Sequence, residues 1–476
     1  MSDILTPDIC VIGAGSGGLS VAAAAAAFGV EVVLIEKGKM GGDCLNYGCV
    51  PSKAMLAAGK HAQMIRDAVK FGVNAGSDIN VNFAKVHEHV HDVIASIAPH
   101  DSVERYTALG VHVIEASGRF IDDKTVEAGG KTIKARRFVV ATGSSAFVPP
   151  ISGIDKVKYL TNETLFENKK KMNHLVIIGG GPIGMEMAQA HRRLGCDVTV
   201  VEGFKALGKD DPELSAVVLE QIRKEGVNIL EDTMVSSVEQ RGKTGIRVIC
   251  KHGENETKID GTHLLVATGR SPNVEGLGLE EAGIAFDRRG IKVKDDLRTT
   301  NKRVYAIGDV AGGLQFTHVA GYHAGLVIRG ILFRKKAVPN NQIVPWVTYT
   351  DPELAHVGMT EEEAQKKYSE IRILRWPYDE NDRAKAERKT AGFIKLITDK
   401  KGRILGTSIA GASAGEMINF WALAITQNLK TRDITGYIPP YPTLTEIGKR
   451  AAVDYYAPLT RKPLIRSVIG FLQKFG

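Results

Sequence analysis

Cysteine is scarce in this 476-residue sequence, which has five, at positions 10, 44, 49, 196 and 250. They are too few and too scattered for the disulfide framework that holds a small secreted domain together. Cys10, Cys196 and Cys250 lie in or beside apolar, strand-like runs, so we interpret them as small buried hydrophobic residues. One close pair remains, Cys44 and Cys49.

Other absences narrow the class of protein further. No basic block with interleaved aromatic residues is present, and a net charge of +8 is mild, so nucleic acid is not an expected partner. No apolar run reaches the roughly 20 residues of a transmembrane helix. The mostly apolar stretch 19–35 contains Gly29 and Glu31, which favours an internal helix and strand over a signal-peptide core. We therefore expect a cytoplasmic protein.

Glycine, in contrast, is abundant, with 51 residues. Gly13, Gly15 and Gly18 have the spacing G-x-G-x-x-G directly after the apolar run 8–12. In this motif the first glycine makes the turn, the second lets a pyrophosphate approach, and the third packs helix on strand. The phosphate lies at the positive end of the helix that follows. Glu36 ends the next apolar run, where a carboxylate can bind ribose hydroxyls.

A second copy of this pattern predicts a second nucleotide-binding fold. Gly179, Gly181 and Gly184 follow the apolar run 175–178, and Glu202 takes the place of Glu36. A carboxylate there repels a 2′-phosphate, so we expect NAD rather than NADP. Two similar strand-plus-turn segments, 138–143 and 264–269, close the two halves. Within or beside them we assign four residues to cofactor binding: Thr142, Gly143, Gly269 and Arg270.

The segment Gly41 to Lys53 contains Cys44 and Cys49. In a regular helix, residues five apart differ by about 7.5 Å in rise alone. A disulfide requires Cα atoms within about 7 Å. A bridge therefore needs a distorted turn, which Gly48 can supply. A zinc site would need two more clustered ligands, so we expect no metal, and a close pair in a cytosolic protein is more often redox-active than structural.

This segment, together with the two glycine motifs, resembles the active-site signature of the pyridine nucleotide–disulfide oxidoreductases, which include dihydrolipoamide dehydrogenase, glutathione reductase and mercuric reductase. The resemblance extends from Asp8 to about Tyr456 and implies FAD and a nicotinamide nucleotide as cofactors. It implies that Cys49 is the charge-transfer thiolate against the flavin and that Cys44 exchanges with substrate. Four further residues match family positions: Lys53 and its carboxylate partner Glu186 near the flavin, and Gly308-Asp309 at the ribityl chain.

One position departs from the family pattern. Dithiol-handling members end in His-Pro-Thr-x-x-Glu, whose histidine is the acid–base catalyst of the partner subunit, whereas this chain has Tyr441 and retains Glu446. A phenol with a pKa near 10 is a poor base at neutral pH. Tyrosine here is similar to soluble transhydrogenase, which lacks the cysteine pair. Tyrosine near the thiols is also similar to mercuric reductase, whose extra C-terminal cysteines and metal-binding N-terminal domain are not found here.

After about Gln342 the pattern changes to alternating strands and a long apolar helix near 418–427, which predicts an α+β module with a mixed sheet. We therefore expect an α/β protein with two Rossmann-like nucleotide-binding domains plus an α+β dimerisation domain. The predicted boundaries are 1–150 for the first part of the FAD domain, 151–275 for the NAD(P) domain, 276–342 for the return of the FAD domain, 343–456 for the dimerisation domain and 457–476 for a tail.

The expected activity is an FAD-dependent NAD(P)H:disulfide oxidoreductase similar to dihydrolipoamide dehydrogenase. It would act as a homodimer with a shared site on a small-molecule or protein-bound disulfide or dithiol. Alternatives are a mercuric reductase-like enzyme, a transhydrogenase or quinone reductase, and a flavin-bound redox sensor. The tail places apolar residues at helical spacing beside basic ones, as a membrane-surface helix does. We favour packing on the dimer, because Gly470 weakens the helix and the segment is short.

Overall fold

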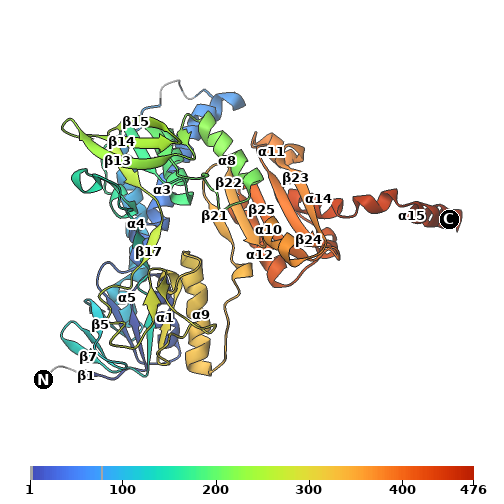
Figure 1. Ribbon diagram of the computed structural model, residues 1–476. Helices are drawn as coiled ribbons and strands as arrows, with labels where there is room; N and C mark the ends of the chain where they lie inside the picture. Colours follow the sequence, from blue (N-terminus) through green and yellow to red (C-terminus); the bar gives the residue numbers. More distant parts are fainter. Residues whose placement is uncertain (1–3, 75, 77–78, 476) are drawn as a thin grey trace. The chain divides into compact units, whose positions relative to one another are not determined.

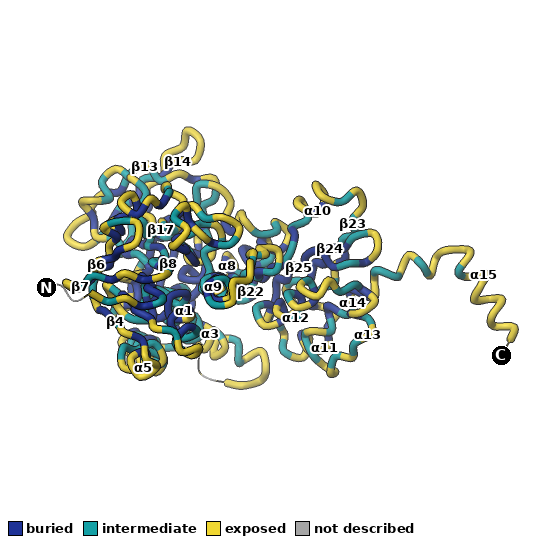
Figure 2. The backbone as a smooth tube through the Cα atoms, turned by 90° about the horizontal axis from the view of Figure 1, so that it is seen from below, coloured by how far each residue is buried: buried dark blue, intermediate teal, exposed yellow. Residues whose placement is uncertain are grey.

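The computed structural model describes residues 4–74, 76 and 79–475. The chain divides into two compact units (Figure 1). The first unit comprises Met1–Gly203 and Asn228–Pro339, and the second comprises Phe204–Val227 and Asn340–Gly476. Each unit encloses its own buried apolar residues, which Figure 2 shows in dark blue.

A five-stranded parallel sheet forms the first half of the first unit. Its strands, in spatial order, are β20 (Val304–Ala306), β8 (Arg137–Val140), β2 (Ile9–Ile12), β3 (Val32–Glu36) and β4 (Val111–Glu115). The strands read as apolar runs because parallel sheets are buried on both faces. Helices α1 (Ser16–Ala27) and α9 (Thr317–Phe333) pack on each other and share one core with the sheet. The first predicted βαβ unit is therefore confirmed.

A second parallel sheet forms the other half of the first unit and confirms the second βαβ unit. Its strands are β12 (Asn228–Leu230), β11 (Asp197–Val201), β10 (His174–Ile178) and β16 (His263–Val266), with α7 (Pro182–Arg193) between β10 and β11. Between β12 and β16 the chain forms an antiparallel sheet of β13 (Met234–Arg241), β14 (Gly245–His252) and β15 (Asn255–Gly261). Our sequence interpretation noted only the apolar run that Cys250 ends, in β14, and did not include this sheet, because β13 and β15 are mostly exposed or half-buried and lack an apolar run.

The two halves are connected at the ends of β8 and β16. Directly after these strands, β9 (Ser144–Ala146) and β17 (Arg270–Pro272) pair in antiparallel fashion. Another four-stranded sheet has the order β1 (Ile4–Leu5), β7 (Lys131–Ile133), β6 (Val126–Ala128), β5 (Gly118–Phe120). Further helices of this unit are α2 (Gly42–Asn46), α3 (Cys49–Asp67), α4 (Phe83–Ile97), α5 (Val103–Ala108) and α6 (Asn162–Leu165).

The second unit is built on a five-stranded sheet. Its order is β21 (Trp346–Thr348), β22 (Glu353–Gly358), β25 (Ile404–Gly411), β24 (Phe393–Asp399), β23 (Ile371–Pro377), and every pairing is antiparallel. The expectation of a mixed sheet is therefore wrong: the connections are hairpins and short helices rather than the crossovers that parallel strands require. Helices α12 (Ala414–Thr426) and α14 (Glu446–Asp454) pack on the apolar side of this sheet.

Helix α8 (Pro212–Lys224) packs on β22 and β25 within the second unit. Asp211 and Glu213 lie just before and at the start of α8, and both pair with Lys395. The Lys395 side chain is 2% exposed, and its Nζ lies 2.7 Å from a carboxylate oxygen of each. Glu361 lies 2.6 Å from the same nitrogen, and Arg375 also binds Glu213. Three carboxylates thus surround one buried ammonium, which explains their clustering without a metal ion.

Replacing Lys395 with methionine should lower the free energy of unfolding by about 3 kcal/mol, near the lower end of the range for breaking a buried ion pair. The three carboxylates lose their shared counter-ion, although Glu213 keeps Arg375. Urea denaturation of the FAD-loaded protein measures the change. Lys366→Met is the matched control, because Lys366 pairs with Glu362 on an exposed helix surface and should change the value by less than about 0.5 kcal/mol. Equal effects of the two substitutions would contradict the prediction.

The tail contains η7 (Ala457–Arg461), α15 (Pro463–Leu472) and η8 (Gln473–Phe475). No residue of α15 is buried, and Figure 2 shows this helix as exposed along its length. Across the described part of the chain, no helix combines the length and the apolar character needed to cross a membrane.

Candidate active site

The two glycine-rich turns have the same geometry, and only two of the three glycines in each are required by the protein itself. Gly13 has φ +105°, and a Cβ there would lie 2.4 Å from the Ala141 carbonyl oxygen. A Cβ on Gly18 would lie 1.8 Å from the Gly13 oxygen. The middle glycine, Gly15, has no atom within 4 Å of that position. Open space beside a helix N-terminus is what an approaching pyrophosphate requires.

The second turn repeats this arrangement. A Cβ on Gly179 (φ +110°) would lie 2.4 Å from the Ala267 oxygen, and one on Gly184 would lie 2.0 Å from the Gly179 oxygen. Gly181 again faces open space, with nothing within 4 Å. Both turns therefore fit a dinucleotide phosphate, each at the start of its own helix.

The two strand-end carboxylates lie against these turns. Glu36 Oε2 accepts a 2.6 Å hydrogen bond from the Ala14 amide, and Glu202 Oε2 accepts one of 2.7 Å from the Gly180 amide. Each carboxylate thus binds the backbone amide of the residue that follows the first glycine of its turn. A negative group so placed can accept hydrogen bonds from ribose hydroxyls and opposes a 2′-phosphate.

The residues predicted from the strand-plus-turn segments lie where the two halves of the first unit are connected. Gly143 (φ +68°) and Gly269 (φ +134°) both have open space at the Cβ position. Thr142 Oγ1 donates to the Asn273 carbonyl oxygen at 2.8 Å. The Arg270 side chain donates to Ser144, both to its hydroxyl at 2.7 Å and to its carbonyl at 2.6 Å.

Asp309 lies in the same neighbourhood, just after Gly308 (φ +65°) in η4 (Gly308–Ala311). Its Oδ2 accepts a 2.5 Å hydrogen bond from the Ser144 hydroxyl and lies 3.9 Å from Arg270 Nε. Burial raises the pKa of the Asp309 carboxyl above its ordinary value, against the hydrogen bond from Ser144 and the charge of Arg270. Arg270 also pairs with Asp43 at 3.2 Å, which connects this carboxylate to the cysteine segment.

The two cysteines meet at a break between helices. Cys44 lies in α2, and Cys49 is the first residue of α3; Tyr47 and Gly48 between them leave the helical conformation. This interruption is the distorted turn that the sequence spacing requires. The thiols are not bridged in this structure, and Cys44 and Cys49 are hydrogen-bonded to each other. Cys49 Sγ also lies 3.3 Å from Thr317 Oγ1, at the start of α9.

The electrostatics of the pair are strongly asymmetric. The hydrogen bond from Cys44 is the main cause that lowers the pKa of Cys49 to about 6, with help from Thr317 and the charge of Lys53, and against burial. The same hydrogen bond, together with burial, raises the pKa of Cys44. Reduced protein therefore carries a thiolate at Cys49 and a thiol at Cys44 at neutral pH, and the thiolate is the nucleophilic form.

Lys53 lies one turn into α3, and its Nζ forms a 2.9 Å ion pair with Glu186 of α7. Glu186 is buried, which fixes the direction of the lysine. The structure thus unites four predicted residues from distant positions: Cys44, Cys49, Lys53 and Glu186. Sequence reasoning missed Thr317, Ser144 and Asp43, because single hydroxyl and carboxyl residues carry no motif of their own.

Tyr441 and Glu446 belong to the second unit. The Tyr441 side chain is 72% exposed, and its hydroxyl donates to Asp382 Oδ2 at 3.0 Å. That hydrogen bond is the main cause that raises the pKa of Tyr441 above its ordinary value. Glu446 Oε2 accepts from the Thr443 amide at 3.3 Å. Asp382, which carried no signal in the sequence, is therefore the carboxylate that holds the phenol within this chain.

Comparison with known proteins agrees with this geometry. The sequence profile described as pyridine nucleotide-disulphide oxidoreductase matches residues 7–324, and the profile of its dimerisation domain matches residues 344–452. A mercuric reductase of Bacillus cereus is 36% identical over 94% of this chain and 71% of its own length. A dihydrolipoyl dehydrogenase of Geobacillus stearothermophilus is 33% identical over 93% of this chain and 94% of its own length.

Two solved structures have a similar fold. The HOCl-induced flavoprotein disulfide reductase RclA of Escherichia coli is 27% identical with a TM-score of 0.84, over 94% of this chain and 99% of that one. LpdA of Mycobacterium tuberculosis is 26% identical with a TM-score of 0.86, over the same shares. The chain therefore belongs to the pyridine nucleotide–disulphide oxidoreductase family, whose members use FAD and NAD(P)H.

Proposed function

We propose that this protein is an FAD-dependent NAD(P)H:disulfide oxidoreductase of the dihydrolipoyl dehydrogenase kind, with Cys44 and Cys49 as its redox pair. One observation carries the proposal: the break between α2 and α3 joins a low-pKa Cys49 to a thiol at Cys44, beside the Lys53–Glu186 pair. Bound FAD would supply two-electron transfer between the nicotinamide nucleotide and this pair. The turn at Gly13–Gly18, Glu36 and Asp309 would hold it, and the turn at Gly179–Gly184 and Glu202 would hold the nucleotide.

The two thiols would have different roles: Cys44 reacts with the substrate, and Cys49 closes the disulfide. Cys44, once deprotonated, attacks a substrate disulfide, and one substrate thiolate leaves. Cys49 then attacks the Cys44 sulfur of the mixed disulfide, which releases the second substrate thiolate and forms the Cys44–Cys49 bridge. The Cys49 thiolate, hydrogen-bonded to Cys44, would accept the Cys44 proton and pass it to the departing substrate thiolate, which returns Cys49 to the thiolate form before its own attack. Steady-state turnover with lipoamide, glutathione disulfide, Hg²⁺ and a quinone tests the class of substrate, and turnover with the quinone alone would contradict the proposal.

A mercuric reductase-like activity is the second candidate. It is favoured by the relatives named mercuric reductase, which are 32% to 36% identical to this chain. Tyr441 in place of the histidine is consistent with a substrate such as Hg²⁺, which carries no proton for a base to remove. In the same assay, NADPH- or NADH-dependent loss of Hg²⁺ that exceeds lipoamide turnover would favour this candidate over the first.

The pH dependence of the reduced enzyme follows from the Cys49 pKa. The thiolate is present above a pKa of about 6 and is protonated as the pH falls through that value. We therefore expect the long-wavelength flavin–thiolate absorbance of the two-electron-reduced enzyme to be nearly constant from pH 8 to 7, to fall to about half near pH 6 and to be largely lost about one pH unit lower. Lys53→Met should move the midpoint upward, because a neighbouring cation is lost. A midpoint near the ordinary thiol value of about 8.5 in the wild type would refute this assignment.

The nucleotide preference should depend on Glu202. We propose that NADH is the better donor and that Glu202→Arg shifts the ratio of kcat/KM values toward NADPH. A hydrogen bond from ribose to a carboxylate is worth about 1.5–3 kcal/mol, which corresponds to a ratio change of roughly 10- to 150-fold. Glu36→Arg is the matched comparison, because it stands at the same position of the other turn and should weaken FAD binding instead. A wild type that prefers NADPH would overturn the prediction.

We further propose a homodimer that forms through the second unit. The match of residues 344–452 to the family's dimerisation domain supports it, as does the exposed Tyr441, which would complete the site of the partner. A disulfide or dithiol substrate, small or protein-bound, is proposed on the same basis. The cytoplasmic location remains our prediction from the sequence.

A further inference from the structure

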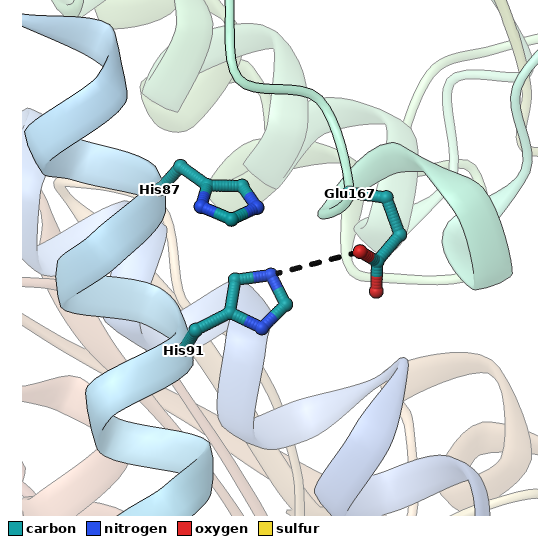
Figure 3. A group of neighbouring side chains, drawn as sticks. All are labelled: His87, His91 and Glu167. Carbon is teal, nitrogen blue, oxygen red and sulfur yellow. Dashed lines mark ion pairs between the residues drawn. The ribbon is translucent and has the colours of Figure 1, made fainter.

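Two histidines and a glutamate gather beside α4, and none of them belongs to the active site described above. His87 and His91 are one turn apart on α4, so their rings lie on the same face, with centroids 4.1 Å apart. Glu167, just after α6, places its Oε2 4.0 Å from His91 Nε2. Figure 3 shows the two rings side by side and the carboxylate opposite them.

The surroundings of His87 point to a missing ligand. His87 Nε2 is buried, and within the described chain it has no hydrogen-bond partner. A buried polar atom without a partner costs free energy and is uncommon in folded proteins. One nitrogen or oxygen of each of the three residues lies within 4.8 Å of the others, so one ion can reach all three after a small inward movement. Glu167 can make that movement because its side chain is exposed.

Two neighbours act against an ion and limit its expected affinity. His91 Nε2 also lies 3.2 Å from the Phe166 carbonyl oxygen, and a bound ion would have to replace that hydrogen bond. The positive charge of Lys169 acts on His87 and would repel a cation bound there, whereas the negative charge of Glu167 would attract one. We therefore expect an affinity in the micromolar range rather than that of a closed structural site.

We propose that His87, His91 and Glu167 form a binding site for a divalent late transition-metal ion such as Zn²⁺ or Cu²⁺. Two imidazoles and one carboxylate suit these ions, whereas Mg²⁺ and Ca²⁺ prefer oxygen ligands alone. Three protein ligands leave a position for water. The ion would tie α4 to the segment after α6. From the sequence we expected no metal, because we looked only for ligands clustered with Cys44 and Cys49.

The test is calorimetric titration of the untagged, oxidised, FAD-loaded protein with Zn²⁺. We expect one site whose Kd rises at least about tenfold in His87→Ala and in His91→Ala, which is about 1.4 kcal/mol each. His89→Ala is the matched control: it removes an exposed histidine from the same helix, outside the cluster, and should leave Kd unchanged. Cu²⁺ bound to the wild type should show magnetic coupling to two nitrogens in its electron paramagnetic resonance spectrum.

A second variant separates this site from the thiols, which also bind metals. The double substitution Cys44→Ser, Cys49→Ser should retain the Zn²⁺ site with the same Kd. Loss of binding in that variant would assign the ion to the redox pair and overturn the proposal. Equal loss in the His89 control, or no change in the His87 and His91 variants, would show adventitious binding and overturn it as well.

The tail carries an independent inference. From position 457 to 475 the sequence has four basic residues and no acidic one. Apolar side chains recur at helical spacing, at Leu464, Val468, Phe471, Leu472 and Phe475, and each is at least 49% exposed. In the described structure α15 packs mainly on its own neighbours η7 and η8. A soluble helix rarely leaves such a face uncovered.

We infer that this tail binds the surface of an anionic lipid membrane. An amphipathic helix with lysine and arginine on its polar side inserts its apolar face at the level of the headgroups. Its positive charge is opposite in sign to that of anionic lipid headgroups, so binding should depend on anionic lipid. A second copy of the tail offers no comparable match, because the tail has no acidic residue with which to pair.

Flotation of the FAD-loaded protein with vesicles tests this inference. We expect binding to vesicles of phosphatidylcholine with 30% phosphatidylglycerol, about tenfold weaker binding to phosphatidylcholine alone, and loss in Leu464→Asp, Val468→Asp. Val338→Asp is the control, because it places the same charge on an exposed apolar residue outside the tail. Binding that survives the double substitution would refute the inference. A change of oligomeric state without vesicle binding would show that the tail packs on a second copy, also against it.

Discussion

Replacing Cys49 with serine should abolish disulfide reduction and the long-wavelength absorbance of the reduced enzyme, while FAD stays bound. Cys49 is the low-pKa member of the pair, and its partner Cys44 is protonated and lacks a second thiol with which to form a bridge. Turnover should fall by about 10³-fold or more, as when an essential nucleophile is removed. FAD retention is expected because, within the described chain, no hydrogen bond or ion pair joins Cys49 to the Gly13–Gly18 turn, to Glu36 or to Asp309.

Cys44→Ser is the matched variant that separates the roles of the two thiols. It should lose turnover equally but keep a thiolate at Cys49, because a serine hydroxyl can still donate a hydrogen bond to it. The long-wavelength absorbance should then be present before any reductant is added. Absorption spectra and anaerobic titration with NADH measure both effects. Normal disulfide turnover in Cys49→Ser, or an identical spectrum in the two variants, would show that Cys49 is not the flavin-side thiolate with Cys44 as its thiol partner.

The nucleotide-binding turns could be predicted because their requirements are local. Gly13 must adopt a positive φ and leave room for the Ala141 carbonyl, and Gly18 must leave room for the Gly13 carbonyl. Only glycine satisfies these conditions, so backbone sterics appear directly in the sequence. The break at Gly48 is similar: the spacing of Cys44 and Cys49 excludes a continuous helix between bridged cysteines, and the structure ends α2 and begins α3 there.

The rest depends on contacts between distant positions. Thr317 reaches Cys49 from the start of α9, and Ser144 and Arg270 meet because β9 pairs with β17. No short motif records such pairings. Lys395 is a further case: its burial depends on Asp211 and Glu213, which come from an earlier part of the chain at the start of α8. The contacts of these side chains can be assigned only when the fold is known.

The sequence reveals that Tyr441 replaces the histidine of the family pattern, but only the structure shows which residue the phenol contacts. From the family pattern we expected Glu446 to orient the residue at this position. In this chain the phenol instead donates to Asp382, while Glu446 accepts from the Thr443 amide. The hydrogen bond to a carboxylate raises the pKa of Tyr441. The phenol therefore remains protonated through neutral pH and can donate a hydrogen bond or hold a thiolate, but it does not accept a proton.

Tyr441→His should accelerate lipoamide turnover. The imidazole titrates near neutral pH and can take the proton of an incoming dithiol, and Glu446 is retained to orient it. General acid–base catalysis contributes typically about 10²–10⁴-fold, so even a partial rescue should raise kcat at least about tenfold. The pH profile of kcat in the histidine variant should acquire a limb near the imidazole pKa, at about 6.5, with activity falling below it.

Two further variants decide whether the phenol itself acts. Tyr441→Phe removes the hydroxyl but keeps the ring, and Asp382→Asn removes the acceptor's charge but keeps its shape. If the tyrosine holds the leaving thiolate of the native substrate, the phenylalanine variant should lose activity with that substrate. Asp382→Asn should keep activity, because it lowers the phenol pKa toward its ordinary value. Fast lipoamide turnover in the wild type that is unchanged in Tyr441→Phe would show that this position transfers no proton. It would then assign that step to a water molecule or to another residue, with Tyr441 only filling the mouth of the site.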